Sequence, residues 1–335
     1  MAPPILVTGA AGFAGSHLLD LLQADDVPVV AWRRPGERLP APPTGTQCQW
    51  MEVELLDAGA VRAAVRAIGP SVVYHLAGLA HVGGSWSRTH QTLRVNVLGT
   101  HHLLTAVAAL AARPRVLITG SAHVYREQDR AVTELDPIGP ASPYALSKLA
   151  QELAGAHAAA DLGLAVLLTR PFNHIGPRQD GSFFASGVAR HIVRVERGLA
   201  APILDVGNLE ARRDLMDVRD TVRAYRAIAE HGRPGAVYNV CGGRAYRIGD
   251  LLDALLARGR VAIEVRRDPA RLRPHDAPLV LGDHGRLTRE LGWEPHIPIE
   301  QTVADLLEYW RGVADEPSRA PAEVADARPG PTRRP

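Results

Sequence analysis

The amino-terminal segment ILVTGAAGFAGSHLLDLL restricts the possible folds more than any other part of the sequence. An apolar run over residues 5–7 leads into Gly9, Gly12 and Gly15, and then into leucines at helical spacing. This order of strand, glycine turn and helix is the context in which a glycine-rich motif binds a dinucleotide. Gly9 would permit the turn, Gly12 would admit backbone N–H groups to a pyrophosphate, and Gly15 would let helix pack on strand. The helix start would favour the anionic phosphates.

The end of the second predicted strand, residues 28–32, indicates which dinucleotide binds. An acid there would bind the ribose 2′-hydroxyl of NAD, but the chain carries Arg33 and Arg34. Arginine suits the 2′-phosphate of NADP, so NADP(H) is the predicted cofactor. NAD(H), with a solvated basic turn or a subunit contact at this point, is the alternative. Further along, Glu54 and Asp57 either meet the adenine or cap the helix that follows.

A candidate proton-transfer device lies in the middle of the chain. Tyr144 and Lys148 are four residues apart in SPYALSK, and Ser121 precedes them in ITGSAHVY. Positions four apart share a helix face, so the ammonium would lie close to the phenol. A nearby cation lowers a phenol pKa from its usual value of about 10. The phenol would then exchange a proton near neutral pH, while Ser121 would hydrogen-bond the same substrate oxygen.

Composition excludes several classes of protein. The net charge of +2 over 335 residues gives no reason to expect nucleic acid or membrane as a partner. The sequence has no apolar run long enough to span a bilayer and no signal peptide, which predicts a cytoplasmic location. Cys48 and Cys241 form no CxxC motif and no Cys/His cluster, so neither a disulfide framework nor a metal site is predicted.

Strand-like and helical stretches alternate up to about residue 170, which is typical of a Rossmann-type, doubly wound parallel α/β sheet. Helices are predicted over residues 91–111 and 144–160, and their alanine-rich faces would pack against a second subunit in a homodimer. After RPFNHIGP the elements become shorter. We predict a NADP-binding Rossmann domain over residues 1–172, to which 213–240 returns, a smaller C-terminal substrate-binding lobe mainly over 173–312, and a disordered tail over 314–335.

Motifs spread along the chain carry a family resemblance. TGAAGFAG, HLAG, NVLGT, the Ser121, Tyr144 and Lys148 set and RPFNHIGP together resemble the extended short-chain dehydrogenase/reductases that act on nucleotide sugars. The resemblance covers residues 4–312. The second half is most similar to the GDP-6-deoxy-4-keto-mannose reductases, which make GDP-rhamnose, through RPFNHIGPRQ, GNLEARRDLMDVRD, VYNVCGG and DPARLRP. It is also similar to the GDP-mannose 4,6-dehydratases, which share the paired arginine and prefer NADP.

The resemblance implies roles for individual residues. Ser121 and Tyr144 would polarise and protonate the sugar C4 oxygen, Lys148 would tune Tyr144 and hold the nicotinamide ribose, and Asn96 would fix the helix geometry nearby. The implied cofactor-binding residues are Gly9, Gly12, Phe13, Ala14, Gly15, Arg33, Arg34, Glu54, Leu55, Leu76, Ala77, Gly78, Tyr144, Lys148 and Pro171. The implied substrate-binding residues are His81, Ser85, Ser121, His123, Asn173, Ser186, Arg213 and Arg273.

Three positions depart from the family pattern. His123 stands where the dehydratases, and usually the reductases, carry an acid. Because loss of water from the sugar needs an acid and a base there, 4,6-dehydration is not expected, although His123 has a pKa range suited to carrying protons. Leu79 stands where glutamine is usual, and Arg126 stands where glycine is common.

The expected activity is NADPH-dependent reduction of a nucleotide-linked 4-keto-6-deoxyhexose, with GDP-4-keto-6-deoxy-D-mannose giving GDP-D-rhamnose. A nucleotide-sugar C4 epimerase would use the same Ser121, Tyr144 and Lys148 and is the first alternative. Net consumption of NADPH separates these two enzymes. A catalytically silent nucleotide-binding regulator is the alternative from another class, because a fold alone does not establish activity.

Overall fold

The computed structural model describes residues 3–24, 27–37, 48–271 and 276–313. Its main layer is a seven-stranded sheet whose neighbouring strands are all parallel. The strand order is β10 (Val237–Val240), β6 (Ala165–Pro171), β5 (Arg115–Thr119), β4 (Val72–His75), β1 (Ile5–Thr8), β2 (Val29–Arg33) and β3 (Cys48–Glu52). The chain winds outward from β1 in both directions, so the predicted doubly wound Rossmann-type sheet is confirmed.

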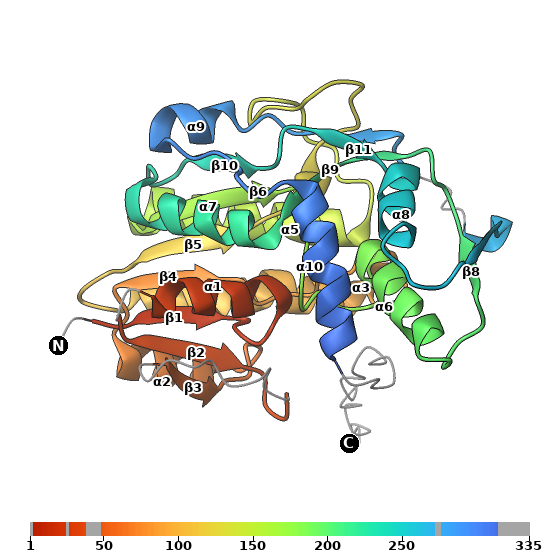
Figure 1. The fold of residues 1–335 in the computed structure, drawn as a ribbon. Coiled ribbons are helices and arrows are strands. Elements are labelled where there is room, and N and C mark those ends of the chain that lie inside the picture. The colour runs from red at the N-terminus through yellow and green to blue at the C-terminus, as the bar shows by residue number, and fades with distance from the viewer. Residues whose placement is uncertain (1–2, 25–26, 38–47, 272–275, 314–335) are drawn as a thin grey trace, which may run out of the picture.

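Helices cover both faces of this sheet (Figure 1). One face carries α1 (Phe13–Gln23), α7 (Val218–His231) and α9 (Gly285–Leu291), and the other carries α2 (Ala58–Ile68), α4 (Gly99–Ala108) and α5 (Pro143–Leu162). Leu18 and Tyr225 belong to the apolar cluster on the first face, and Val61 and Leu103 to the cluster on the second. The central strands β1, β4 and β5 are therefore buried on both faces, which explains their nearly continuous apolar sequences. No helix in the described ranges is long and apolar enough to cross a membrane.

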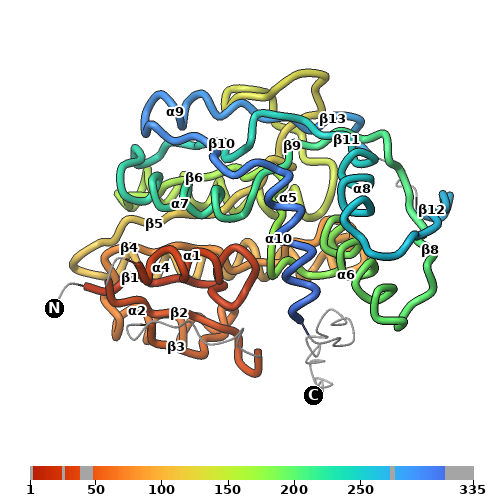
Figure 2. The backbone as a smooth tube through the Cα atoms, in the orientation of Figure 1, coloured from red at the N-terminus to blue at the C-terminus, as the bar shows by residue number. Residues whose placement is uncertain are grey.

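A smaller lobe lies beside the carboxyl ends of the strands (Figure 2). Its strands are β7 (Asn173–Ile175), β8 (Ile203–Val206), β9 (Arg212–Asp217), β11 (Ala245–Arg247), β12 (Glu264–Arg267) and β13 (Leu279–Val280). Its helices are α6 (Phe184–Glu196), α8 (Ile248–Leu256) and α10 (Ile299–Gly312). Ile192, Leu255 and Leu306 from the three helices meet in one apolar core. Short helical turns are η1 (Gly83–Ser85), α3 (Thr89–Leu93), η2 (Arg94–Leu98), η3 (Ala122–Val124) and η4 (Pro269–Arg271).

The segment 213–240 divides between the two parts of the molecule. Helix α7 and strand β10 lie in the main layer, as the sequence predicts. Strand β9 instead lies in the small sheet between β11 and β13 and also pairs with β7. The predicted disordered tail, 314–335, lies outside the described residues.

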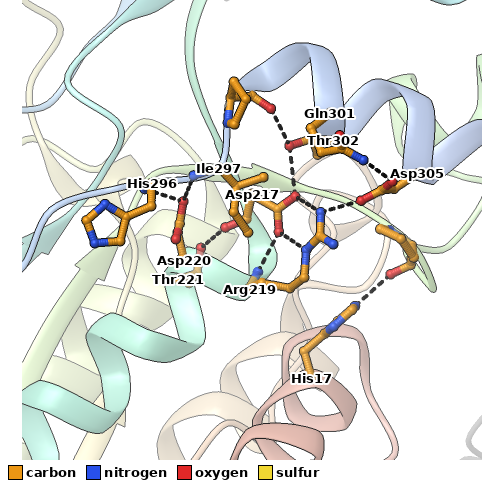
Figure 3. Close-up of polar contacts among 12 residues, drawn as sticks. His17, Asp217, Arg219, Asp220, Thr221, His296, Ile297, Gln301, Thr302 and Asp305 are labelled. Carbon is orange, nitrogen blue, oxygen red and sulfur yellow. Dashed lines mark hydrogen bonds and ion pairs between the residues drawn. The ribbon is translucent and has the colours of Figure 1, made fainter.

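The start of α7 fastens the lobe to the main layer (Figure 3). The fully buried Asp217 caps α7 by accepting from the backbone N–H of Arg219, and it also accepts from the hydroxyl of Thr302 on α10 at 2.8 Å. The Arg219 guanidinium bridges Asp217 to Asp305, with 2.7 Å contacts to both. Asp220, one turn on, accepts from two backbone N–H groups just before α10. These satisfied carboxylates hold α10 against α7 and β9.

Helix α2 depends on its capping residue, which gives a first prediction. The Asp57 carboxylate accepts 2.9 Å hydrogen bonds from the backbone N–H groups of Gly59 and Ala60. Asp57→Ala should lower the free energy of unfolding by about 0.5–2 kcal/mol, because these donors lose their partner. Urea denaturation measures the change. Arg62→Ala on the exposed face of the same helix is the control and should leave the midpoint unchanged; an equal loss in both variants would contradict the capping role.

Candidate active site

The glycine turn lies where β1 and β4 end side by side, at the point where the winding direction of the sheet reverses. Gly9 has φ +66°, and a Cβ atom there would lie 2.6 Å from the backbone nitrogen of Ala77. A Cβ on Gly15 would lie 2.2 Å from the carbonyl oxygen of Gly9. Only glycine allows this approach. Gly12 begins α1 without a side-chain cap, so the first N–H groups of that helix suit an anion.

Other predicted cofactor contacts surround this turn. Phe13, in the first turn of α1, stacks on His174 with ring centroids 5.6 Å apart. Leu76, Ala77 and Gly78 follow β4 directly beside Gly9, and Pro171 ends β6. Ala14 packs against the apolar cluster on the first face, and the buried Leu55 belongs to the cluster on the second. The structure thus brings the predicted cofactor residues to one edge of the sheet.

The paired arginines have partners of their own. Arg33 Nη2 lies 2.6 Å from Glu52 Oε1, an acid on β3 that the sequence argument did not consider. The more exposed Arg34 guanidinium lies 4.0 Å from Glu37 Oε1. Glu54 is exposed and accepts from the backbone N–H of Leu56, whereas Asp57 caps α2. Arg34 is therefore the arginine with more freedom to meet a 2′-phosphate.

The helix predicted over residues 91–111 is interrupted at the site. Residues of η2 form a π-helical segment between α3 and α4, and the fully buried Asn96 lies in it. The Asn96 side chain accepts from the Leu79 backbone N–H at 2.8 Å and donates to Ser147 Oγ at 2.9 Å. A Cβ on Gly78 would lie 2.9 Å from Asn96 Oδ1, so the loop after β4 is pressed against this amide. Such π-segments are frequent at functional sites.

Two of the three proton-transfer candidates, Ser121 and Tyr144, are in contact, and Lys148 lies one turn further along the same helix as Tyr144. Tyr144 and Lys148 lie in the first turns of α5, both buried, and Ser121 follows β5 at the start of η3. The Ser121 hydroxyl hydrogen-bonds the Tyr144 phenol. Ser85 Oγ accepts from the Tyr144 backbone N–H at 3.2 Å, so the loop after β4 also fixes the start of α5. The resemblance suggested a substrate contact for Ser85, and this anchoring contact was missed.

The pKa shifts differ from the sequence argument. Burial raises the pKa of Tyr144, and the hydrogen bond from Ser121 only opposes this. Burial also lowers the pKa of Lys148 to about 7. The expectation of a lowered Tyr144 pKa is thus wrong, because burial disfavours the charged phenolate. The lowered pKa brings Lys148 into the range in which a group titrates at neutral pH. The raised pKa moves Tyr144 further from that range.

Lys148 is the only lysine in the sequence; every other residue among the 38 lysines and arginines is arginine. Its Nζ donates to the backbone oxygen of Thr119 at 2.7 Å and to Gln151 Oε1 at 2.8 Å. Both acceptors are neutral. Arginine could not serve here as a proton carrier, because its guanidinium stays charged at any ordinary pH.

Two histidines flank the proton-transfer residues. The exposed His123 presents its ring edgewise to Tyr144, with centroids 5.9 Å apart. His81 lies against Phe183 at the start of α6, with centroids 5.6 Å apart, so it links the loop after β4 to the small lobe. Leu79 is half-buried, and its backbone N–H and C=O groups both hydrogen-bond the Asn96 side chain. The ring contact places an imidazole, rather than an acid, next to the Tyr144 phenol.

The remaining substrate candidates are engaged within the lobe. Asn173 Nδ2 donates to the Asp214 backbone oxygen at 3.4 Å, and Arg213 Nη2 lies 2.5 Å from Asp276 Oδ1. Ser186 is fully buried; its hydroxyl donates to the Gln179 backbone and accepts from the Trp310 indole. Arg273 lies outside the described residues. The substrate roles of these four residues stay predictions.

The geometry suits proton transfer to or from an oxygen next to a bound dinucleotide. A hydroxyl and a buried phenol meet at one point, with a single amine behind them, and an uncapped helix start lies at the adjoining strand end. No group of three or more His, Cys, Asp or Glu side chains that could hold a metal ion occurs among the described residues.

Comparisons with known proteins agree with this arrangement. Residues 6–306 match the family described as GDP-mannose 4,6 dehydratase. GDP-6-deoxy-D-mannose reductase of Pseudomonas aeruginosa is 36% identical over 92% of this chain and 98% of its own. The structure of RMD from Pseudomonas aeruginosa complexed with NADPH has a TM-score of 0.81 and 34% identity, over 92% of this chain and 99% of that one. UDP-glucose 4-epimerase of Thermus thermophilus in complex with NAD has a TM-score of 0.83 and 26% identity, over 93% and 100%.

Proposed function

Because this chain belongs to the GDP-mannose 4,6-dehydratase family of extended short-chain dehydrogenase/reductases, we propose that it is an NADPH-dependent reductase of a nucleotide-linked 4-keto-6-deoxyhexose. GDP-4-keto-6-deoxy-D-mannose is the proposed substrate and GDP-D-rhamnose the product, and the similarity to the Pseudomonas reductase supports this choice. The observation that carries the proposal is the buried meeting of Ser121, Tyr144 and Lys148 beside an exposed His123.

The residues present fit the cofactor. A Cβ atom on Gly9 or Gly15 would clash with protein backbone, so both glycines keep the turn tight, and the uncapped start of α1 offers N–H groups to a diphosphate. Arg34 and Arg33 would hold the 2′-phosphate, and Lys148 would hold the nicotinamide ribose. When bound, NADPH supplies the hydride for the sugar C4 carbon.

The side chains of this protein then handle the proton. Tyr144 donates its phenolic proton to the C4 oxygen as negative charge develops there, and Ser121 hydrogen-bonds the same oxygen. The ammonium of Lys148 stabilises the phenolate that remains and, with a pKa of about 7, exchanges protons with solvent at neutral pH. His123 offers no carboxylate for removing a proton from C5, so loss of water from C6 is not supported.

The test is the absorbance of reduced nicotinamide during reaction with GDP-4-keto-6-deoxy-D-mannose. Stoichiometric loss of the NADPH signal, with formation of GDP-rhamnose by NMR, is the expected result. A change in the sugar without net loss of NADPH would instead identify a C4 epimerase. Binding of NADPH and GDP-sugar without any turnover would favour a catalytically silent nucleotide-binding protein. Either outcome would overturn the proposal.

Cofactor preference gives a second prediction. Arg34→Ala should raise the KM for NADPH by about tenfold or more, because a charge-assisted contact to phosphate is worth roughly 1.5–3 kcal/mol. The KM for NADH should change little, since NADH lacks the 2′-phosphate. Steady-state kinetics with both cofactors measure the difference. Equal losses for NADPH and NADH would contradict the proposed role of Arg34.

We also propose that the protein forms a homodimer through α4 and α5. Leu146 and Leu153, seven residues apart on α5, are 49% and 59% exposed and share one helix face. A second copy of the same face would cover them. Light scattering of the wild type should give a dimer mass and that of Leu153→Glu a monomer mass; a monomeric wild type would exclude the proposal.

We also propose a reducing, cytoplasmic location, which the two free cysteines, Cys48 and Cys241, support.

A further inference from the structure

A chain of buried hydrogen bonds joins the glycine turn to the proton-transfer site. It begins at Thr8, the last residue of β1, and passes through His75 on β4, Thr100 on α4 and Gln151 on α5 to Lys148. Its four links measure 2.8, 2.8, 2.9 and 2.8 Å in that order. None of the five side chains is more than 5% exposed.

The direction of each bond follows from the ammonium at one end. Lys148 can only donate, so the Gln151 side chain must turn its oxygen to Lys148 and its NH₂ group to Thr100. The single hydroxyl proton of Thr100 goes to the Asn96 backbone oxygen, 2.7 Å away, so Thr100 accepts from Gln151. If the Gln151 amide were flipped, its N–H groups would face the ammonium of Lys148. Its oxygen would face the Thr100 hydroxyl, whose proton is already donated to Asn96.

The same reasoning fixes the imidazole. Thr100 must accept from His75 Nε2–H as well, so His75 Nδ1 carries no proton and accepts from the Thr8 hydroxyl. Thr8 in turn accepts from the backbone N–H of Ala77 at 3.2 Å. Each hydrogen bond along this chain therefore runs in one direction only. The orientation of the Gln151 side chain is thus coupled, bond by bond, to Thr8 at the cofactor edge of the sheet.

Within the described ranges, both hydrogen-bond acceptors of Lys148 are neutral, and the nearest carboxylate in sequence is already paired. Glu152, its neighbour on α5, pairs with Arg170 on β6 at 2.6 Å. Burial and the charge of Lys148 lower the pKa of His75 on β4 to about 3, so that ring is neutral. Tyr144 on α5 and His123 on η3 lie on the side of the reacting oxygen. A carboxylate at position 151 would thus be the first unpaired negative charge in contact with the amine.

We propose that Gln151 is a positioning residue for Lys148, whose amine it holds through a neutral carbonyl, beside the backbone oxygen of Thr119. The hydrogen bond exists in the free enzyme, whereas its effect on turnover rests on the proposed reductase function. A carboxylate in place of the amide would stabilise the ammonium, and an apolar side chain would destabilise it.

The direct test uses the single lysine. In the full-length protein labelled with ¹³C-lysine, one Cε signal reports the titration of Lys148, with an expected midpoint of about 7. Gln151→Glu should raise this midpoint by about one unit or more, and Gln151→Met should lower it. Gln179→Met removes another buried glutamine, one that donates to the His174 backbone, and is the matched control with an unchanged midpoint.

Opposite shifts in the two variants would establish the role, and an unmoved midpoint in either folded variant would overturn it. Near-UV circular dichroism shows which of the two Gln151 variants are folded. One folded variant is enough to test the proposal, because each has its own expected direction of shift. The pH profile of kcat/KM is the second readout, because it reports ionisations of the free enzyme. Its alkaline limb should move with the NMR midpoint. If the NMR midpoint of Lys148 shifts but the alkaline limb of the kcat/KM profile does not, the effect of Gln151 on turnover is refuted. If the wild type shows no turnover, only the proposed reductase function is refuted, because the NMR midpoints still test the role of Gln151.

Discussion

Tyr144→Phe is expected to lower kcat for reduction by about 10³-fold, because a positioned general acid contributes roughly 10²–10⁴-fold to such steps. Phenylalanine keeps the ring that contacts His123 and removes only the oxygen that Ser121 contacts. Cofactor binding should therefore survive, with a dissociation constant for NADPH within about twofold of the wild type, a free-energy change of about 0.4 kcal/mol. Stopped-flow oxidation of NADPH and fluorescence titration measure the two quantities separately.

A matched control is available on α10. Tyr309→Phe also removes one phenolic oxygen, at a position outside α5 and its neighbours, and should leave kcat unchanged. If Tyr144→Phe kept wild-type turnover, another group would have to donate the proton. His123, whose ring lies edgewise on Tyr144, would then be the first residue to test.

Arg170→Met is expected to have the largest effect on stability, lowering the free energy of unfolding by about 3–5 kcal/mol. Arg170 meets Glu152 with two parallel bonds of 2.9 and 2.6 Å and also donates to the Tyr125 hydroxyl at 2.9 Å. Both partners of the ion pair are nearly buried, at 6% and 8% side-chain exposure. Removing the guanidinium leaves a buried carboxylate without a partner, and that penalty exceeds the value of the pair itself. Urea denaturation measures it.

The control for this prediction is an ion pair with the same fork geometry on the surface. Arg266 meets Glu264 with bonds of 2.9 and 2.8 Å, yet both side chains are more than half exposed. Arg266→Met should leave the unfolding midpoint within experimental error, because water replaces the lost contact. Comparable losses at Arg170 and Arg266 would show that geometry, rather than burial, sets the cost.

Local sequence patterns were sufficient for the core of the fold and for the proton-transfer residues. The apolar run before Gly9 and the helical spacing after Gly15 each depend on neighbours in sequence, so the turn could be read directly. Tyr144 and Lys148 share a helix face for the same reason. The strand over residues 28–32 and the observed β2 differ by one residue at each end.

Features that depend on distant contacts could not be read in that way. The π-segment of η2 exists because Asn96 bonds to Leu79 and to Ser147 across two other elements. Gln151 has no motif of its own, and its importance comes from Thr100, 51 residues away. The Arg33 partner, Glu52, lies on the neighbouring strand rather than in the adjacent turn.

The pKa of Tyr144 shows a second limit. The sequence places a cation four residues away but does not show how much water the phenol loses. Lys148 makes its hydrogen bonds to Thr119 and Gln151, and the dominant influence on both ionisable groups is burial. A helix spacing gives the separation of two groups, whereas their protonation depends on the medium between and around them.

The position of β10 in the chain has a consequence for synthesis on the ribosome. This strand closes the edge of β6, yet its residues follow the first half of the small lobe. Until residue 240 has emerged, the backbone edge of β6 has no partner, although Leu167 and Leu168 make it an apolar strand. The cofactor-binding half therefore cannot complete its fold as a separate amino-terminal unit, and nascent chains that stall before this point expose an aggregation-prone edge.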